Sequence, residues 1–578
     1  MSNAILRSRI WSRIQAGVDE AEAHFRSTCG SDTLADGETA AALFLSDGSI
    51  VTDGTHSAPF LSMLLRPWVD QVRSGGDTSG VVVSNDPYGS GGSVADLKMA
   101  TPVVIEGEVV AWCAMAGHYP DVGGRMVGGV APGVRTIQEE GIRLPVCAST
   151  PNLFHLISEN ARLPSTTLQD LEAQQSAVGV LGEWLTGLSG TYGWEVIAGA
   201  IDQVQVRGQA GLKKAMTELK PGIYVRRDRL DSDVAFEPVP LVVTLSVDDT
   251  GLVLDFDGTG PTSVGPTNCT RESTIAATIC GLRHIFPEIP ACGFRIEDLE
   301  IRVPHGSLLD ASFPAPVGGT TDVLADRVTS LVIEALSQAV HGRGQACDGG
   351  GGDVIVLESH DPDHPFALRF VVGTGGGASG RGDGLLNADV STRHSRFPSI
   401  EDVERTYPVR LRHYGERDKS GGAGRYRGAN GTVLEVEWCC KGRLSLYVDR
   451  FSRGAGGHHR GGRGSVTELE VYTDGHWQRP AGIGRLQSLE VVPGDRVRIR
   501  TAGGGGYGHP YERAVRLLQE DVSAGRLTRK EAAKDHGVVF TSPDGRDYDS
   551  AKTFKLRSYR LTSSDVDDFL DEIETLED

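Results

Sequence analysis

Long hydrophobic runs are missing from this chain of 578 residues. No apolar stretch approaches the roughly 20 residues that a helix needs to cross a bilayer, so we expect no membrane span. An excess of positive charge is missing too, because the formal net charge is -20. Proteins that bind nucleic acids present a basic face to the phosphates, and we therefore expect no nucleic-acid partner.

Paired cysteines and a nucleotide-binding motif are also lacking. The nine Cys residues are scattered and form no Cys-x-x-Cys pair, which argues against a zinc ribbon or a disulfide framework. The segment from Met1 to Arg13 lacks the hydrophobic core of a signal peptide, so we expect a soluble, cytoplasmic protein with reduced thiols. No Walker pattern follows any glycine run, so ATP is not expected to bind this chain.

Two hydrophobic periodicities are present. Ile10, Ile14 and Val18 have helical spacing, and Val239–Val247 has an apolar residue at every second position. We predict an α+β fold of mixed helical and antiparallel-sheet domains with a β-rich C-terminal part. The predicted domains are 1–220, 221–400 and 401–578. The last of them is predicted to end in a short acidic helix at Ser564–Leu576.

The most informative stretch contains a predicted β-hairpin, formed by Thr101–Ile105 and Val109–Met115. Asp96 precedes this hairpin, and His118 and Asp121 follow it. Because a hairpin returns to its start, the three side chains can converge on one point. A carboxylate and an imidazole on facing loops suit a divalent metal or a general base, although such residues also serve simply to cap turns.

Several motifs occur in a fixed order along the chain. They are Asn85-Asp86-Pro87-Tyr88, Gly91-Gly92-Ser93-Val94-Ala95-Asp96, His118-Tyr119-Pro120-Asp121-Val122-Gly123-Gly124, Ser420-Gly421-Gly422-Ala423-Gly424 and Gly503-Gly504-Gly505-Gly506-Tyr507-Gly508. Together they resemble the hydantoinase B family, which includes N-methylhydantoinase B, the matching half of 5-oxoprolinase, the small caprolactamase chain, and components of acetone and acetophenone carboxylases. The resemblance extends from Thr33 to Val539 and implies a hydantoinase B-like fold.

The resemblance implies a divalent metal, zinc or manganese. In metal-containing relatives the ligands are a His, an Asp three residues later and a His after the hairpin. Asp96 and His118 match two of these positions, whereas Ser93 stands where the family has the first His. The family has a further Glu ligand a few residues before the first strand. Asp36 or Glu38 can stand in for it here without an exact match, and the alternative is that both are solvated loop acids. The resemblance also makes Asp96, His118 and Asp121 the expected catalytic residues.

Four residues are expected to bind the substrate. They are Asn85 and Asp86 of the first motif, His56 in a segment that resembles another cavity-lining motif of the family, and Arg143 in Glu140-Gly141-Ile142-Arg143. For Arg143 a structural salt bridge with Glu140 is the alternative. Arg393, His394 and Arg396 occur where the family has Asn residues, which indicates a more cationic pocket or, alternatively, ordinary surface charge.

Glycine is abundant, with 75 residues gathered in short clusters. Such runs can bind phosphate, but the necessary Lys-(Ser/Thr) does not follow them. We therefore interpret them as sites of close backbone packing and turns.

The function implied by the resemblance is ATP-dependent hydrolysis of a small cyclic amide, of the EC 3.5.2 type. In relatives a hydantoinase A-type ATPase subunit uses ATP and Mg to phosphorylate the substrate, and the B-type subunit directs a nucleophile to the activated carbon. We therefore expect a hetero-oligomer that is active only with its partner. The alternatives are a component of an ATP-dependent ketone carboxylase and a metal-free scaffold subunit.

Overall fold

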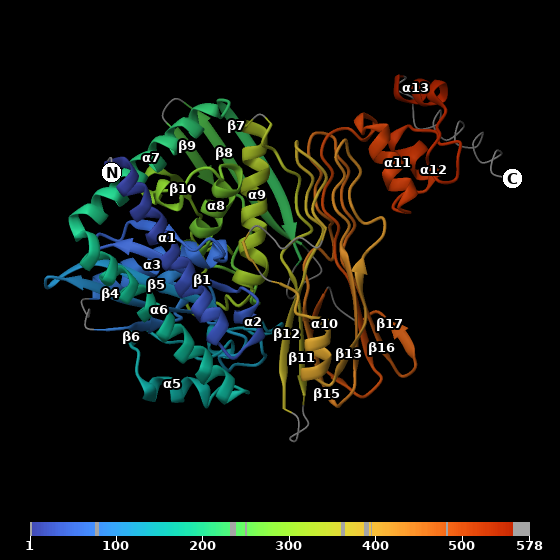
Figure 1. Ribbon diagram of the computed structural model, residues 1–578. Coiled ribbons are helices and arrows are strands. Elements are labelled where there is room, and N and C mark those ends of the chain that lie inside the picture. The colour runs from blue at the N-terminus through green and yellow to red at the C-terminus, as the bar shows by residue number, and fades with distance from the viewer. Residues whose placement is uncertain are drawn as a thin grey trace.

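The computed structural model describes residues 3–75, 80–231, 238–248, 251–340, 342–359, 365–386, 392–394, 396–480 and 484–558 (Figure 1). The predicted helix at Ser564–Leu576 lies outside these residues. Helices and mainly antiparallel sheets are mixed in the N-terminal half, and strands dominate much of the rest. The predicted α+β class is confirmed.

The first sheet has the strand order β2-β1-β5-β4-β3-β6, and all of its neighbouring strands are antiparallel. Its strands are β1 (Thr39–Leu45), β2 (Ile50–Asp53), β3 (Val82–Ser84), β4 (Asp96–Ile105), β5 (Glu108–His118) and β6 (Cys147–Ala148). The predicted hairpin is confirmed as β4 and β5. Both strands are longer than predicted and include Asp96 and His118.

Helices cover both faces of this sheet (Figure 1). On one face lie α1 (Asn3–Thr28) and α6 (Pro164–Tyr192), flanked by α7 (Trp194–Glu218), and on the other lies α3 (Pro59–Gly75). Successive side chains of a strand point to opposite faces of the sheet, so one strand contributes to the cores on both sides. Leu43 belongs to the core beneath α1, and Phe44 belongs to the core beneath α3. The predicted face of α1, with Ile10 and Ile14, is buried there.

A second sheet and two central helices complete the N-terminal part. The sheet has the order β10-β9-β8-β7 and contains β7 (Gly222–Leu230), β8 (Val239–Asp248), β9 (Gly251–Asp255) and β10 (Glu300–Arg302). Helix α8 (Arg271–Ile285) packs on α3 and on α9 (Ala325–Ala339), and α9 packs on the second sheet. A π-helical turn, η4 (Thr320–Leu324), precedes α9. Such turns recur at functional sites.

The third and fourth sheets form a sandwich. The third contains β12 (Ala367–Val372), β11 (Asp353–Ser359), β15 (Gly442–Tyr447) and β18 (Arg485–Val491) in that order. The fourth contains β13 (Val409–Glu416), β14 (Thr432–Trp438), β19 (Arg496–Arg500), β16 (Glu468–Thr473) and β17 (His476–Gln478). The third sheet thus combines strands from both sides of the predicted domain boundary at residue 400.

The third sheet also joins the two halves of the molecule. Ile355 and Leu357 point into the sandwich core, whereas Val354 and Val356 point into the N-terminal core. Arg369 of β12 is paired with Val356 across the sheet and therefore projects towards the N-terminal part. This position brings Arg369 to the candidate site described below.

Glycine-rich segments that are neither helix nor strand run side by side next to the fourth sheet (Figure 1). We call segments 346–350, 373–378, 420–431, 454–465 and 501–508 the glycine-rich bundle. Its backbone amides reach carbonyls of other segments, as in Gly422 N to Gly504 O at 2.8 Å and Gly504 N to Ala429 O at 2.9 Å. The predicted close backbone packing is confirmed, because a Cβ on Gly504 would lie 2.8 Å from Gly375 O and still closer to the Gly376 carbonyl.

Shorter elements occupy the connections and the C-terminal end. They are α2 (Asp32–Ala35), α4 (Pro87–Ser90), η1 (Ile137–Glu139), α5 (Pro151–Ser158), η2 (Ala291–Gly293), η3 (Ile296–Asp298), α10 (Ile400–Thr406), η5 (Pro510–Glu512), α11 (Val515–Ser523), α12 (Arg529–His536) and α13 (Ser550–Ser558). Among the described residues, no helix is both long and apolar enough to cross a membrane.

Candidate functional site

The paired ends of β4 and β5 form the centre of the candidate site. Asp96 and His118 are register partners, and His118 Nδ1 lies 2.7 Å from Asp96 Oδ1. Both side chains are fully buried. The predicted convergence of the two is confirmed, but their predicted placement on loops is wrong, because backbone pairing continues to the last residue of the hairpin.

The second oxygen of Asp96 is surrounded by donors. Asp96 Oδ2 accepts hydrogen bonds from Ser93 N at 2.7 Å, Ser93 Oγ at 3.1 Å and Thr321 Oγ1 at 2.6 Å. Thr321 lies in the π-helical turn, so this turn delivers a side chain from the distant α9 region to the hairpin. The Asp96 carboxylate is therefore held on both oxygens by protein groups.

Glu38 lies beside His118 because it directly precedes β1, which pairs with β5. His118 N donates to Glu38 O at 2.9 Å, and Glu38 Oε2 lies 3.9 Å from His118 Nε2. The other carboxylate oxygen, Oε1, accepts a hydrogen bond of 2.8 Å from Nη1 of Arg369. Of the two acidic residues predicted before the first strand, Glu38 is thus the one that joins the Asp96–His118 pair.

Asp322 links two buried arginines. Its Oδ1 accepts hydrogen bonds from Arg369 Nη2 and from Arg393 Nη1, the latter at 2.8 Å. Arg393 Nη2 donates to the backbone carbonyl of Asp322 at 2.9 Å. Arg393 also lies 4.0 Å from Glu38. We call Glu38, Asp96, His118, Asp322, Arg369 and Arg393 the buried charge cluster.

Charges within this cluster shift the pKa values of Asp96, His118 and Glu38 towards their ionised forms. Burial opposes ionisation of Asp96, but the His118 imidazole beside it lowers the pKa of Asp96 to about 2. Burial likewise favours neutral His118, yet the Asp96 carboxylate raises the pKa of His118 above its ordinary value. The Arg369 guanidinium lowers the pKa of Glu38 in spite of complete burial.

Asp121 and Asp36 have partners of their own. The Asp121 carboxylate lies 3.0 Å from Arg162 Nη1 and accepts the Arg162 backbone amide at 2.6 Å. Asp36 lies near Arg26 and Arg396, and burial together with Asp32 raises its pKa to about 6 against the effect of these arginines. No contact joins either residue to Asp96 or His118 among the described interactions.

The first motif builds structure around the site. Asn85 donates to Val94 O at 2.6 Å and to Ile142 O at 2.8 Å, so its amide ties two loops together. Asp86 accepts the Tyr88 amide at the start of α4 and lies 3.7 Å from Arg143.

Arg143 therefore pairs with Asp86. The Glu140 carboxylate instead accepts the backbone amides of Val317 and Gly318. Asn85, Asp86 and Arg143 do not line the cavity described next.

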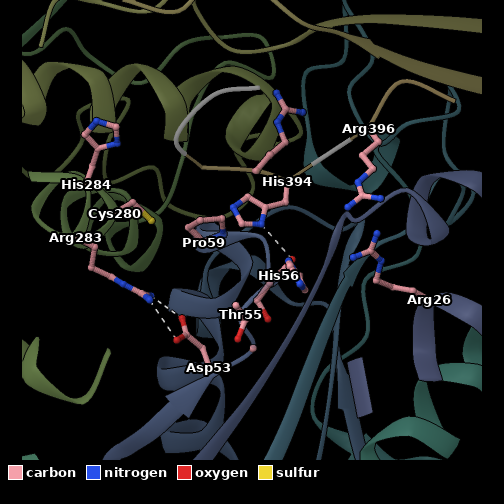
Figure 2. A pocket seen from close by; sticks show the side chains of 13 residues that line it. Arg26, Asp53, Thr55, His56, Pro59, Cys280, Arg283, His284, His394 and Arg396 are labelled. Atoms are coloured by element: carbon pink, nitrogen blue, oxygen red, sulfur yellow. Dashed lines mark hydrogen bonds and ion pairs between the residues drawn. The ribbon is translucent and has the colours of Figure 1, made fainter. Parts of the chain in front are cut away.

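Figure 2 shows the residues that line a cavity of about 630 Å³. The cavity adjoins the buried charge cluster, because Arg393 belongs to its lining. Its lining is strongly basic and includes the arginines Arg26, Arg283, Arg393 and Arg396 and the histidines His56, His284 and His394. Among the described lining residues Asp53 is the one acid, and it already binds Arg283 through two hydrogen bonds of 2.6 and 3.2 Å. Arg393, His394, Arg396 and His56 thus line one basic cavity, and their contact with a substrate stays a prediction.

Two lining residues stand out chemically. Arg393 belongs both to the cavity wall and to the buried charge cluster. His394 Nδ1 lies 3.2 Å from the His56 carbonyl (Figure 2), and because a carbonyl only accepts, this nitrogen carries the proton and Nε2 keeps its lone pair. Burial lowers the pKa of His394 below its ordinary value. A neutral imidazole with a free lone pair suits a general base.

The predicted metal ligands do not fit a divalent ion in this arrangement. Among the described residues, no group of three or more His, Cys, Asp and Glu side chains is placed to hold one. Ser93, at the position of the first His ligand, uses its hydroxyl on Asp96. A guanidinium already occupies one oxygen of Glu38. Zinc or manganese therefore has no step in the function proposed below.

Asp326, on the face of α9 near the cluster, provides a test of buried charge. Both of its carboxylate oxygens are buried without a hydrogen-bond partner among the described residues. Burial, reinforced by Asp348 and Asp449, raises its pKa from 3.8 to about 8. The folded state therefore binds a proton that the unfolded state releases, and the stability from this group falls as pH rises between these two values.

We expect Asp326→Asn to become more stable relative to the wild type as pH increases. The difference should grow by up to about 1.4 kcal/mol per pH unit. Thermal midpoints of both proteins at pH 5, 6, 7 and 8 measure it, with the exposed Asp402→Asn as control. A difference that does not change with pH would contradict the assignment.

Comparison with known proteins agrees with this architecture. A family model described as hydantoinase B/oxoprolinase matches residues 3–510. The chain belongs to this family. The beta chain of the caprolactamase of Pseudomonas jessenii is 26% identical over 491 residues, which are 79% of this chain and 82% of that protein.

Two solved structures share the fold of this hydantoinase B family member. The crystal structure of the ATP-dependent caprolactamase from Pseudomonas jessenii has a TM-score of 0.85 and 23% identity, over 96% of this chain and 99% of that chain. A nucleotide-free structure of acetone carboxylase has a TM-score of 0.83 and 17% identity, over 96% of this chain and 82% of that chain. The implied hydantoinase B-like fold is confirmed.

Several residues of the site escaped the sequence analysis. They are Arg26, Asp53, Arg283, His284, Thr321, Asp322 and Arg369. Arg369 could have been singled out from the sequence, because it interrupts the apolar strand Ala367-Leu368-Arg369-Phe370-Val371-Val372. A charged residue in such a strand is rarely buried without a partner, which predicts an acidic partner for Arg369. For Arg26 and Asp322 only tertiary packing supplies the partner.

Proposed function

We propose that this chain is the B-type subunit of an ATP-dependent hydrolase of small cyclic amides. The observation that carries the proposal is the basic cavity, in which Arg393 and His394 adjoin each other beside a buried charge cluster. A family relative is named as the beta chain of a caprolactamase, and a structure with the same fold is of an ATP-dependent caprolactamase. A hydantoinase A-type ATPase subunit is the proposed partner, in a hetero-oligomer.

The partner supplies what this chain lacks. An amide carbonyl is a poor electrophile, and phosphorylation of its oxygen by the partner, with ATP and Mg, provides a good leaving group. The activated amide then binds in the cavity of this chain. The basic lining suits the negative charge of a phosphate or of a substrate carboxylate.

The proposal assigns the steps to residues that line the cavity. His394 Nε2 takes a proton from water as the water oxygen attacks the amide carbon. The electron pair of the C=N bond moves to the ring nitrogen, which takes up a proton. The C–N bond then breaks, which opens the ring and leaves an acyl phosphate, and a second water hydrolyses this to a carboxylate and inorganic phosphate. In the proposal the negative charge of the phosphoryl group faces the guanidinium of Arg393, which Asp322 holds in place. Asp96 and His118 are buried behind this wall, and in the proposal they position Glu38 and the two arginines and do not touch the substrate.

The arrangement is tested by purifying the chain together with an A-type ATPase partner. With ATP, Mg and a panel of cyclic amides that includes hydantoin, 5-oxoproline and caprolactam, we expect ring opening that requires both chains. Strict dependence on bicarbonate, with no ring-opened product, would favour the carboxylase alternative. Association without any turnover would favour the scaffold alternative.

Arg396 provides a test of substrate binding in the cavity. Arg396→Ala should raise KM for an anionic or phosphorylated substrate about 10-fold and leave kcat nearly unchanged, because a hydrogen bond to a charged group contributes about 1.5–3 kcal/mol. Steady-state kinetics of the complex measure the effect. The control is Arg405→Ala, which removes an exposed arginine on α10 outside the cavity lining. An unchanged KM would exclude this end of the cavity from substrate binding.

A further inference from the structure

We propose that the guanidinium of Arg369 takes the place of the divalent metal ion found in metal-containing members of the family, so that this chain works without a metal at Glu38, Asp96 and His118. The catalytic use of this cluster rests on the proposed function. The replacement of the ion stands on the geometry and can be tested without a substrate.

Arg369 is placed as a bridging cation. One of its terminal nitrogens lies 2.8 Å from Glu38 Oε1, and the other is bonded to Asp322. A guanidinium has several donors in a rigid plane and suits the bridging of two carboxylates. The chain also makes room for its stem, since Gly128 has φ of +90° and a Cβ there would lie 3.2 Å from Arg369 Cδ.

The Oδ2 atom of Asp96 has no lone-pair site left for an ion. Oδ1 is bonded to His118, and Oδ2 accepts three hydrogen bonds from Ser93 and Thr321. A carboxylate oxygen offers about two lone-pair sites, so a metal bond would first have to displace these donors. The hydroxyl of Ser93, which stands where the family has a ligating His, thus completes the shell of Asp96.

The charges are already matched. The carboxylates of Glu38, Asp96 and Asp322 face the guanidiniums of Arg369 and Arg393, and His118 is paired with Asp96. The ammonium of Lys98 is buried nearby and donates to Gly91 O at 2.7 Å. The three carboxylates are thus balanced by two guanidiniums and the Lys98 ammonium, and a divalent ion bound to neutral His118 would add positive charge in a buried place, where unmatched charge is strongly unfavourable.

The first test measures metal in the purified full-length chain. After expression in medium supplemented with zinc and manganese, we expect less than about 0.1 ion per chain at this site, and no change of Tm with chelator or with either ion, because an ion that binds the folded state would raise Tm. His118→Ala and the exposed His155→Ala are compared. Near-stoichiometric metal that is lost in His118→Ala and kept in His155→Ala would overturn the proposal.

The second test examines Arg369 as the replacement for the ion. Arg369→Met should lower Tm, and the double variant Arg369→Met with Glu38→Gln should melt higher than Arg369→Met alone, because it restores the balance of charge. Effects on Tm that simply add would overturn the role of Arg369. If Arg369→Met does not fold, the stability of the double variant and the metal analysis still test the proposal. If the chain had no amide hydrolase activity with its partner, the proposed function would be wrong, but the metal content and the Tm values would still test the replacement of the ion.

Discussion

Gly504→Ala should leave little folded protein. The new Cβ would lie 2.8 Å from Gly375 O and closer still to the Gly376 carbonyl, and both neighbours are backbone. A flexible side chain could rotate away, whereas these segments are tied to each other by backbone hydrogen bonds such as Gly504 N to Ala429 O at 2.9 Å. Overpacking in a core costs about 1–3 kcal/mol even where side chains adjust, so we expect more than about 3 kcal/mol here.

Soluble yield and Tm measure this effect, and the chain offers a matched control. Gly179 lies within α6, and a Cβ there would meet no atom within 4 Å. Gly179→Ala should therefore be neutral or stabilising by up to about 1 kcal/mol, because Ala is the better helix former. If Gly504→Ala gives wild-type yield and Tm, the bundle has more room than its backbone contacts indicate.

His394→Gln should lower kcat of the hydrolase complex by about 100- to 10,000-fold, the usual contribution of a general base. Gln can still donate to the His56 carbonyl, so the loop should keep its position, but it has no basic nitrogen to accept the proton of water. In the proposed function the arginines of the cavity bind the substrate, and KM should therefore change little. Steady-state kinetics with the A-type partner and ATP measure both constants.

The pH profile separates a base from a merely structural residue. His394 acts only when neutral, and burial lowers its pKa below 6.5. The rate should therefore be flat near neutral pH and fall on acidification below that value, and His394→Gln should lose this acid limb. His155→Gln, an exposed histidine on α5, is the control. If His394→Gln had a normal kcat, a group other than His394 would be the general base.

The candidate site was foreseeable in part. The hairpin and the meeting of Asp96 with His118 followed from local periodicity, because strands joined by a short turn must pair in register. The extent of that pairing was not foreseeable, and it turned two expected loop residues into buried strand ends. Because both side chains are fully buried, the proposed function gives them the role of positioning other charges.

The partners of these residues could not be predicted in the same way. Arg369 comes from β12 in the third sheet, and Asp322 comes from a π-helical turn before α9. Their contacts with Glu38 depend on how the third sheet packs against the first. The hydrophobic periodicity of the sequence does not reveal such a contact, because its residues are far apart in the chain. Glu38 and Arg369, for example, lie 331 positions apart.

Local sequence was sufficient for the α+β class, the family, the hairpin, the close packing of glycines and the cationic character of the segment at Arg393, His394 and Arg396. These features arise from neighbouring residues or from ordered motifs. Long-range packing alone placed Arg369 between two carboxylates, separated Asp121 and Asp36 from the Asp96–His118 pair, and put Arg393 at the cavity wall. The physical reason is that a buried charge takes its partner from whichever distant segment the core brings within hydrogen-bond distance.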